Sequence, residues 1–351
     1  MRITVLGGSG FLGSRTVEAL RAAKGVEVQV ASRRGPVVVD ATKPETFDAL
    51  RGSDVVIDLM DCTNVRPDAV AAWCVEHGIT FIEATSDRPA IERLRASALS
   101  GSGLLVLGGG IFTGVSNLLA RAVAEATPAA KELTLGISSS PFSGAGTGTI
   151  ELMTSAMGLP AVRTRDGKRE EVETVTRGPR LPFPAKQRPT LLMSFAEQAM
   201  VPASTGVPSV EVYFAPKPAL LVSAFAMMPG WMLRARWFAA FMGLYFSFLR
   251  KLLLRSVVSA VELFVRVRGS TSEQTRAVTC ADGMMAGAWA LAASAVMLGE
   301  SKPARSGVCF IDDVLKLEPV VARANALAGS AVLLVSPVES APVGAALRAV
   351  A

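Results

Sequence analysis

The sequence predicts an α/β protein in which a doubly wound parallel sheet is followed by a second domain built on an antiparallel sheet. Three observations support this fold class. A short apolar strand meets a glycine-rich turn and a helix at the N-terminus, strand-like runs alternate with helices as far as residue 128, and strand alternation without intervening helices begins at Lys131. The 351 residues are enough for two domains with a sizeable core.

The first stretch, Arg2 to Ser14, has the pattern of strand, tight turn and helix, with glycines at positions 7, 8, 10 and 13. Gly8 permits the sharp turn, Gly10 lets a pyrophosphate approach the backbone, and Gly13 lets the helix pack against the strand. The alternative is a glycine turn without a ligand. The position between a strand and a helix favours a dinucleotide site, formed by Gly7, Gly8, Ser9, Gly10, Phe11, Leu12 and Gly13.

The end of the second strand predicts which dinucleotide binds. The run from Val26 to Ser32 is followed by Arg33 and Arg34, about 20 residues after Gly13, where an NAD site carries an acid for the ribose 2′-hydroxyl. Two guanidinium groups suit a 2′-phosphate instead, although arginines at strand ends are also common as solvated surface charges. We therefore expect NADP, with Ser32, Arg33 and Arg34 among its contacts.

The remaining strand-like runs of this domain each lead into a loop. They are Val37 to Asp40, Asp54 to Met60, Thr80 to Thr85 and Gly103 to Leu107, and a helix over 117–126 follows. Because loops after parallel strands line the ligand crevice of such a sheet, these residues are candidate contacts. Asp40, Asp61 and Cys62 are expected at the cofactor, and Thr85, Thr113 and Ser116 at the substrate.

Two further residues of these loops are candidates for the chemistry. Asp87 is a candidate proton relay, and Asn117 is a candidate contact to the substrate or the nicotinamide amide. Each has a structural alternative, because Asp and Asn are also preferred helix N-caps and both precede predicted helices. His77, which is the one histidine of the chain, ends a predicted helix and is expected to cap it.

Composition narrows the class of protein. Half of the residues are hydrophobic, 19% are charged and the mean hydropathy is +0.40, which indicates a globular chain on the apolar side. The net charge of +6 favours anionic ligands, but no concentrated basic run indicates nucleic acid. The four cysteines form no CxxC pair, so neither disulfides nor a metal site are expected, and a cytoplasmic location fits best. No signal peptide is predicted.

The second domain is expected to contain a hairpin around Asp166 and Gly167 and strands over 131–138, 210–214 and 261–268. Residues 220–260 are the most apolar of the chain. Their uncharged core, Trp237 to Leu249, has thirteen residues, fewer than the roughly 20 that span a bilayer. We expect a helix buried in the core or a dimer interface, with a peripheral membrane contact as the alternative. A helix rich in small residues is predicted over 282–298.

The chain resembles the saccharopine dehydrogenase-like oxidoreductases, in particular bacterial members of unassigned substrate, over nearly its whole length. The order and spacing of the matches carry the resemblance. They are Gly7–Gly13, Ala31–Arg33, Val39–Thr42, Asp54–Asp58, Ala72–Gly78, Phe81–Asp87, Gly110–Leu118 and Gly307–Leu315. The resemblance implies an NADP-binding Rossmann domain, an inserted α+β domain that often dimerises, and C-terminal helices that pack back on the Rossmann domain. It places these parts at 1–128, 129–275 and 276–351.

The expected function is therefore that of an NADP-dependent oxidoreductase. The resemblance implies hydride transfer between NADPH and a small-molecule substrate at a C=N, C=O or C=C centre, and the apolar 220–260 segment suggests a lipid-like substrate. A short-chain dehydrogenase is disfavoured, because its helical Tyr-x-x-x-Lys would fall on Tyr213 to Lys217, where Pro216 and strand alternation oppose a helix. The alternative is a non-catalytic NADP-binding scaffold or redox sensor.

Overall fold

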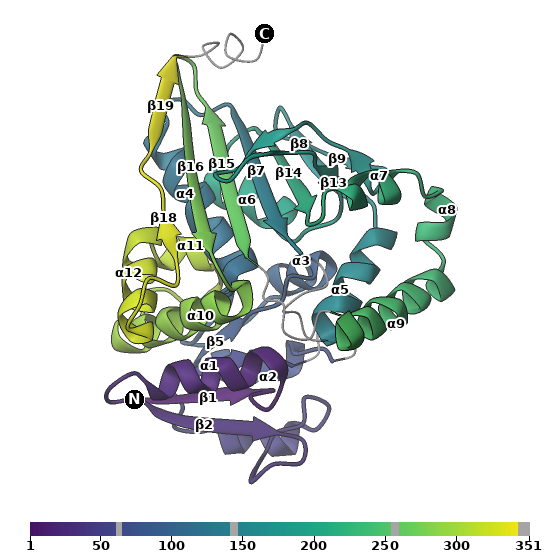
Figure 1. Ribbon diagram of the computed structural model, residues 1–351. Coiled ribbons are helices and arrows are strands. Elements are labelled where there is room, and N and C mark those ends of the chain that lie inside the picture. Colours follow the sequence, from purple (N-terminus) through teal and green to yellow (C-terminus); the bar gives the residue numbers. More distant parts are fainter. Residues whose placement is uncertain (61–64, 141–146, 254–259, 343–351) are drawn as a thin grey trace. The chain divides into compact units, whose positions relative to one another are not determined.

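The computed structural model describes residues 1–60, 65–140, 147–253 and 260–342 (Figure 1). The chain forms two compact units. Unit 1 comprises Met1–Val115 and Met284–Val332, and unit 2 comprises Ser116–Gly283 and Leu333–Ala351. These limits differ from the predicted ones at 128 and 275, because the helix that follows Val115 groups with unit 2 and the chain returns to unit 1 only at Met284.

Unit 1 contains a seven-stranded parallel sheet, which confirms the predicted doubly wound architecture. The sheet has the order β17-β6-β5-β4-β1-β2-β3, so the strand order reverses beside β1. Its strands are β1 (Arg2–Leu6), β2 (Glu27–Ser32), β3 (Val37–Val38), β4 (Val55–Asp58), β5 (Thr80–Glu83), β6 (Leu104–Leu107) and β17 (Gly307–Phe310). β17 adds a strand from the C-terminal part, for which only helices were predicted, so that expectation was incomplete.

The helices of unit 1 connect and cover this sheet. They are α1 (Phe11–Arg21), the 3₁₀ helix η1 (Pro44–Leu50), α2 (Asp68–Glu76), α3 (Arg88–Arg95), the π-turn η2 (Ile111–Val115), α10 (Gly283–Glu300), α11 (Ile311–Val314) and α12 (Leu317–Ala328). His77 follows α2 as its C-cap, and its ring nitrogen Nδ1 lies 2.8 Å from the Trp73 carbonyl oxygen. The predicted capping role of His77 is thus confirmed.

Helix α10 is the small-residue helix expected from the sequence. Its glycines permit close packing, since a Cβ at Gly299 would lie 3.4 Å from Val55 of β4 and one at Gly287 would lie 3.4 Å from the Ile111 backbone. Among the described residues it is the one helix long and apolar enough to cross a membrane. Because 67% of this 18-residue helix is buried inside the protein, the packing of α10 in the core explains its apolar character.

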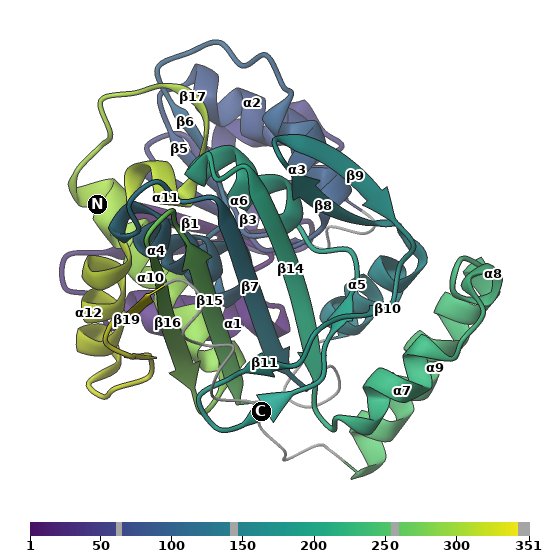
Figure 2. The same cartoon turned by 90° about the horizontal axis from the view of Figure 1, so that it is seen from above.

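Unit 2 is built on a mixed sheet, which corrects the expectation of an antiparallel one (Figure 2). β7 (Glu132–Ser139) and β14 (Ser209–Pro216) run parallel over eight residue pairs, whereas β15 (Val261–Arg268) is antiparallel to both β7 and β16 (Ser272–Cys280). The β7–β14 pairing joins segments far apart in sequence. Strand alternation reveals the strands but not their direction.

Shorter strands extend this sheet. They are β8 (Ala161–Arg165), β9 (Lys168–Val172), β10 (Thr176–Arg177), β13 (Leu191–Leu192), β18 (Leu334–Val335) and β19 (Glu339–Pro342), while β11 (Leu181–Pro182) and β12 (Gln187–Arg188) pair separately. β8 and β9 form the predicted hairpin, in which Asp166 and Gly167 have φ of 47° and 75° as a type I′ turn requires. Tyr213 lies in β14 and donates to Glu211, so the Tyr-x-x-x-Lys match is not helical.

The helices of unit 2 include two that the sequence did not indicate. They are α4 (Ser116–Ala126), α5 (Thr147–Gly158), α6 (Glu197–Thr205), α7 (Leu220–Ala226), α8 (Gly230–Leu233) and α9 (Arg236–Leu253). α5 follows a stretch rich in Ser and Gly, and α6 contains Pro202 within a proline-rich region, which hides their helical periodicity.

Candidate functional site

The parallel register of unit 1 brings the ends of its strands into one row. Leu6 pairs with Ala31 of β2 and with Asp58 of β4, and Asp58 pairs in turn with Glu83 of β5. The loops that follow these residues therefore leave the sheet at the same edge. In a doubly wound sheet the ligand crevice lies at this edge, where the strand order reverses beside β1.

The glycine turn after β1 is packed so tightly that side chains are excluded at two of its positions. Gly7 has φ of +71°, and a Cβ there would overlap the carbonyl of Leu59 beyond β4. A Cβ at Gly13 would overlap Gly7 O and lie 2.8 Å from Gly8 Cα. These glycines are required for the turn itself, whether or not a ligand binds.

Gly10 is less tightly enclosed. Among the described residues other than its chain neighbours, the one heavy atom within 4 Å of a Cβ at Gly10 is Gly7 O, a close contact at 3.1 Å, and this oxygen already accepts the Gly10 N–H at 2.9 Å. The φ and ψ of Gly10, −71° and 176°, are accessible to any residue. Glycine at this position thus leaves room at the backbone, as the approach of a phosphate requires.

The start of α1 supplies the matching electrostatics. Gly10 is the N-cap and has no side chain to cap the helix, and the first-turn N–H groups of a helix have no carbonyl partner within the helix. Together with the helix dipole they favour an anion. Arg15 adds a cation to this turn, because its guanidinium lies 3.9 Å above the Phe11 ring and donates to Phe11 O at 2.7 Å. The i, i+4 spacing of Phe11 and Arg15 could have revealed this contact in the sequence.

Arg33 and Arg34 lie in the turn that follows β2. The Leu6–Ala31 pairing places this turn beside the glycine turn, and both arginines are exposed. Neither forms an ion pair with any residue in the described ranges. Their guanidinium groups are accessible to an anionic ligand at the position where the sequence predicts the ribose 2′-phosphate.

Asp40 is held in a local turn. Its carboxylate accepts hydrogen bonds from the Thr42 N–H at 3.0 Å and the Thr42 hydroxyl at 2.7 Å. These bonds, followed by the charges of Lys43 and Arg33, hold the pKa of Asp40 below its usual value. Its cofactor contact stays a prediction. Asp61 and Cys62 lie outside the described residues.

Thr85 and Asp87 follow β5 and are tied to the backbone. The Asp87 carboxylate is the N-cap of α3 and accepts the Ala90 N–H at 3.1 Å, while the Asp87 N–H donates to the Thr85 hydroxyl at 3.1 Å. Burial raises the pKa of Asp87. The capping alternative is therefore observed, and the role of Asp87 as a proton relay stays a prediction.

Thr113 occupies a strained position in the loop after β6. It is fully buried with φ of 58°, a region that a β-branched residue rarely adopts. Its hydroxyl lies 2.6 Å from Phe112 O and 3.2 Å from Thr85 O, so the loops after β5 and β6 are linked. Such strain is often found at functional sites, and it is consistent with the predicted place of Thr85 and Thr113 at the substrate.

Ser116 and Asn117 begin helix α4 and belong to unit 2. The Ser116 hydroxyl donates to Glu197 of α6 at 2.8 Å. Asn117 lies inside the helix, so it is not the N-cap, and its side chain is fully buried. Within the described residues neither atom of its amide has a hydrogen-bond partner, which is unusual for a buried amide. Its contact to the substrate or the nicotinamide stays a prediction.

A pair of buried acids was missed by the sequence reasoning. Asp58 and Glu83 end the adjacent strands β4 and β5, both are nearly fully buried, and the charge of Asp58 acts on the Glu83 carboxyl. Asp58 also accepts the Met60 N–H at 2.8 Å, and Glu83 accepts the Thr85 N–H at 2.9 Å. Burial raises the pKa of Asp58 to about 6 and that of Glu83 well above its usual value, so both carboxyl groups lose their protons at higher pH than exposed acids do.

No group of three or more His, Cys, Asp or Glu side chains that could hold a metal ion occurs in the part of the chain that the structure describes. The described residues of the candidate site come from the glycine turn, the arginines after β2, the acids that end β4 and β5, and the loops after β5 and β6.

Comparison with known proteins gives structural neighbours only. No protein-family model matches the chain, and no curated protein matches it. Similar solved structures include a DAP dehydrogenase of C. glutamicum in complex with DAP, with 11% identity, coverage of 90% of this chain and 94% of the other, and a TM-score of 0.49. An oxidoreductase from Sinorhizobium meliloti has 13% identity, coverage of 96% of this chain and 99% of the other, and a TM-score of 0.40. A third is an oxidoreductase from Agrobacterium radiobacter in complex with NAD+, L-tartaric acid and magnesium, with 11% identity, coverage of 95% of this chain and 98% of the other, and a TM-score of 0.40. These likenesses concern the fold, and any function must be argued from the site.

Proposed function

We propose that the chain is an oxidoreductase that binds NADP at the glycine turn of unit 1, as its resemblance to the saccharopine dehydrogenase-like oxidoreductases suggests. The observation that carries the proposal is the open backbone at Gly10 beside two exposed arginines without ion-pair partners in the described ranges. The first favours a pyrophosphate and the second a 2′-phosphate. The solved neighbours, which include an NAD+ complex, are consistent with a dinucleotide.

The residues that would hold the cofactor follow from this geometry. The N–H groups at the start of α1 would bind the pyrophosphate, and Arg33 and Arg34 would bind the 2′-phosphate. When bound, NADP supplies hydride chemistry at its nicotinamide. Asp58 and Glu83, whose pKa values are raised, would supply a proton at this sheet edge, which the Thr85 and Thr113 loops border.

Replacing Arg33 with alanine is expected to weaken NADPH binding about tenfold or more, because a charge-assisted hydrogen bond contributes about 1.5–3 kcal/mol. NADH lacks the 2′-phosphate, so its binding should change by less than about twofold. Fluorescence titration of the purified protein with both nucleotides measures the difference.

Arg21, which is exposed in the last turn of α1, provides the matched control. Arg21→Ala removes the same charge at the opposite end of the helix and should leave NADPH affinity unchanged. Equal losses in both variants would indicate a general charge effect, and equal affinity of the wild-type protein for NADH and NADPH would contradict the assignment of NADP.

A non-catalytic NADP-binding scaffold or redox sensor is the second candidate. It is favoured by the capping role of Asp87, since the residue predicted to relay a proton is engaged with the Ala90 backbone. An enzyme should oxidise bound NADPH faster when a suitable C=N, C=O or C=C acceptor is added. A sensor should bind the nucleotide with no such acceleration across an acceptor screen.

A further inference from the structure

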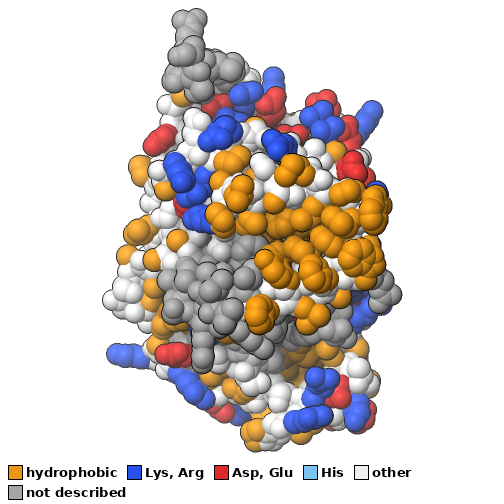
Figure 3. Space-filling model, turned by 45° about the vertical axis from the view of Figure 1, so that its right-hand side comes forward, with side chains coloured by type: hydrophobic (Ala, Val, Ile, Leu, Met, Phe, Trp, Pro, Cys, Tyr) orange, Lys and Arg blue, Asp and Glu red, His pale blue; other side chains and the backbone are white. Residues whose placement is uncertain are grey.

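The outer side of helices α7, α8 and α9 exposes large apolar side chains to solvent. Of the exposed large apolar residues in the described part of the chain, all but Val38, Leu334 and Val338 lie between Leu220 and Phe248. Trp231 and Trp237 are 67% and 61% exposed. We call the following set the aromatic face, which Figure 3 shows within a broad hydrophobic area: Trp231, Trp237, Phe241, Leu244, Tyr245 and Phe248.

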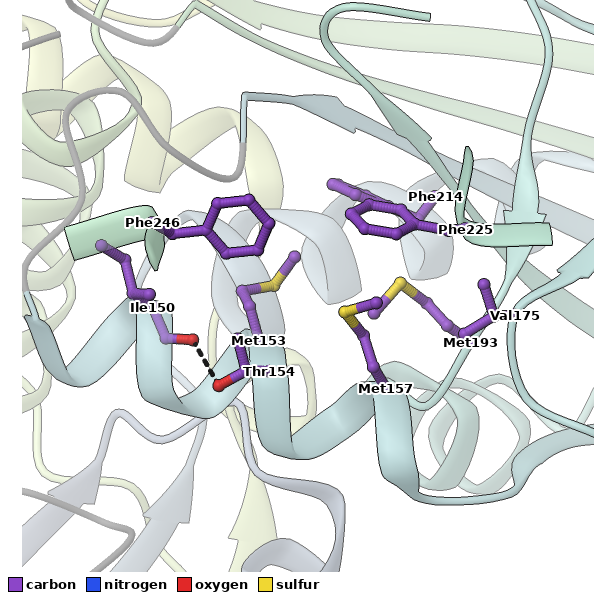
Figure 4. Close-up of a pocket in the computed structure, with 9 residues that line it drawn as sticks. All are labelled: Ile150, Met153, Thr154, Met157, Val175, Met193, Phe214, Phe225 and Phe246. Atoms are coloured by element: carbon purple, nitrogen blue, oxygen red, sulfur yellow. Dashed lines mark hydrogen bonds between the residues drawn. The ribbon is translucent and has the colours of Figure 1, made fainter. Parts of the chain in front are cut away.

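The inner side of α9 already has its packing partners. Phe238, Met242 and Phe246, spaced four residues apart, are buried, and α9 packs against α5. Figure 4 shows Phe246 facing Met153 of α5 across a small apolar cavity. The one polar side chain of this lining, Thr154, donates to Ile150 O at 3.0 Å. Helix α9 therefore carries apolar side chains on both sides. Packing within the chain covers the inner side and does not account for the apolar residues on the outer side.

The charge of this segment indicates the kind of partner. Between Pro218 and Ala260 the sequence contains no Asp or Glu, whereas it contains Arg234, Arg236, Arg250, Lys251 and Arg255. Lys217, just before this segment, is paired with Glu262 at 2.8 Å and is not counted among these cations. Arg177 adds a further cation beside α7, where it donates to the Ser223 hydroxyl at 3.4 Å. Trp, Tyr and Phe combined with flanking Lys and Arg are typical of helices that lie in the headgroup region of a membrane.

A second copy of the chain fits this surface less well. A two-fold interface places the same patch on both subunits, so the basic segment would face itself. No carboxylate between Lys217 and Ala260 could then neutralise these cations, and like charges across an interface oppose association. Anionic phospholipid headgroups provide the opposite charge, and the acyl region accepts the rings.

We propose that α7, α8 and α9 bind the surface of a bilayer that contains anionic lipids, with the aromatic face inserted at headgroup depth. This inference does not depend on the cofactor site, because vesicle binding is measured without nucleotide. Since the segment between its flanking arginines is too short to span, the helix lies in the plane of the interface.

Flotation of the full chain with vesicles tests the proposal. Vesicles of phosphatidylcholine with phosphatidylglycerol should bind the protein at least about tenfold more tightly than vesicles of phosphatidylcholine alone, and added salt should weaken binding. The double variant Trp237→Ser, Phe241→Ser should bind about a hundredfold more weakly, which corresponds to roughly tenfold for each ring. Tryptophan emission should shift to the blue on binding, since Trp231 and Trp237 leave water.

The matched control is Val38→Ser, Leu334→Ser, which removes two exposed apolar side chains that do not belong to α7, α8 or α9 and should bind vesicles as the wild type does. Circular dichroism checks that both double variants fold, as expected for exposed positions. Absence of binding to anionic vesicles would overturn the proposal. A wild-type dimer that ignores vesicles and dissociates in Trp237→Ser, Phe241→Ser would instead identify the face as a self-association surface.

Discussion

Gly10→Ala is expected to weaken NADPH binding by at least about a hundredfold while the protein stays folded. The added methyl group would occupy the open space beside the turn, where the pyrophosphate is expected. Loss of two charge-assisted bonds to backbone N–H groups, at about 1.5–3 kcal/mol each, accounts for the effect. The backbone angles of Gly10 suit alanine, so the free energy of unfolding should fall by only about 1 kcal/mol for the changed N-cap.

Gly13→Ala should behave in the opposite way. Its Cβ would meet Gly7 O and Gly8 Cα, both of which belong to the backbone and have no room to move aside. We expect a loss of about 3 kcal/mol in the free energy of unfolding, at the upper end for overpacking. Thermal denaturation separates the two variants, and fluorescence titration gives their NADPH affinities.

Gly243→Ala in α9 provides the control, because the nearest heavy atom to its Cβ is Thr154 Oγ1 at 3.9 Å. It should leave NADPH binding unchanged and raise the free energy of unfolding by about 0.5–1 kcal/mol, because glycine inside a helix is less favourable than alanine. If Gly10→Ala binds NADPH as the wild type does, no phosphate approaches that backbone and the proposed cofactor site is wrong. If Gly10→Ala unfolds instead, the turn has a structural requirement that the geometry does not show.

The elements that the sequence predicted are those specified by local spacing. The glycines after β1, the alternation of apolar strands with helices and the Asp166–Gly167 turn each lie within a few residues of one another, so sequence periodicity reveals them. β17 was missed because it joins the parallel sheet from a segment about 200 residues after β6. The parallel pairing of β7 with β14 is non-local for the same reason.

The candidate site shows the same division. The position of Arg33 was predicted from the number of residues between it and the glycine turn, because this spacing is fixed within one βαβ unit. Asp58 and Glu83 were overlooked because each looks like an ordinary polar end of an apolar strand, and only the register of β4 with β5 makes them neighbours. An acid closing each of two consecutive buried strands is the signal that could have found them. The buried amide of Asn117, which has no hydrogen-bond partner among the described residues, could not be predicted, because its burial depends on tertiary packing and not on sequence spacing.

The Asp58–Glu83 pair should make the protein less stable as pH rises through neutrality. In the folded state the pKa of Asp58 is about 6, compared with 3.8 for an unperturbed carboxyl, and that of Glu83 is raised as well. The folded protein therefore keeps protons that the unfolded chain releases. Its stabilisation is complete below about pH 4 and is lost as pH rises through about 6 and beyond. About two pKa units correspond to roughly 3 kcal/mol.

Glu83→Gln isolates this effect. The glutamine oxygen still accepts the Thr85 N–H, so this contact persists without a titrating group. Urea denaturation between pH 4.5 and 8 should show the wild type losing more stability than this variant, because the raised pKa of Glu83 contributes only in the wild type whereas Asp58 titrates in both. Glu45→Gln, the same change at an exposed position of η1, should follow the wild type. Parallel curves for all three proteins would mean that the pKa of Glu83 is not raised in the folded state, which would contradict this account of the pair.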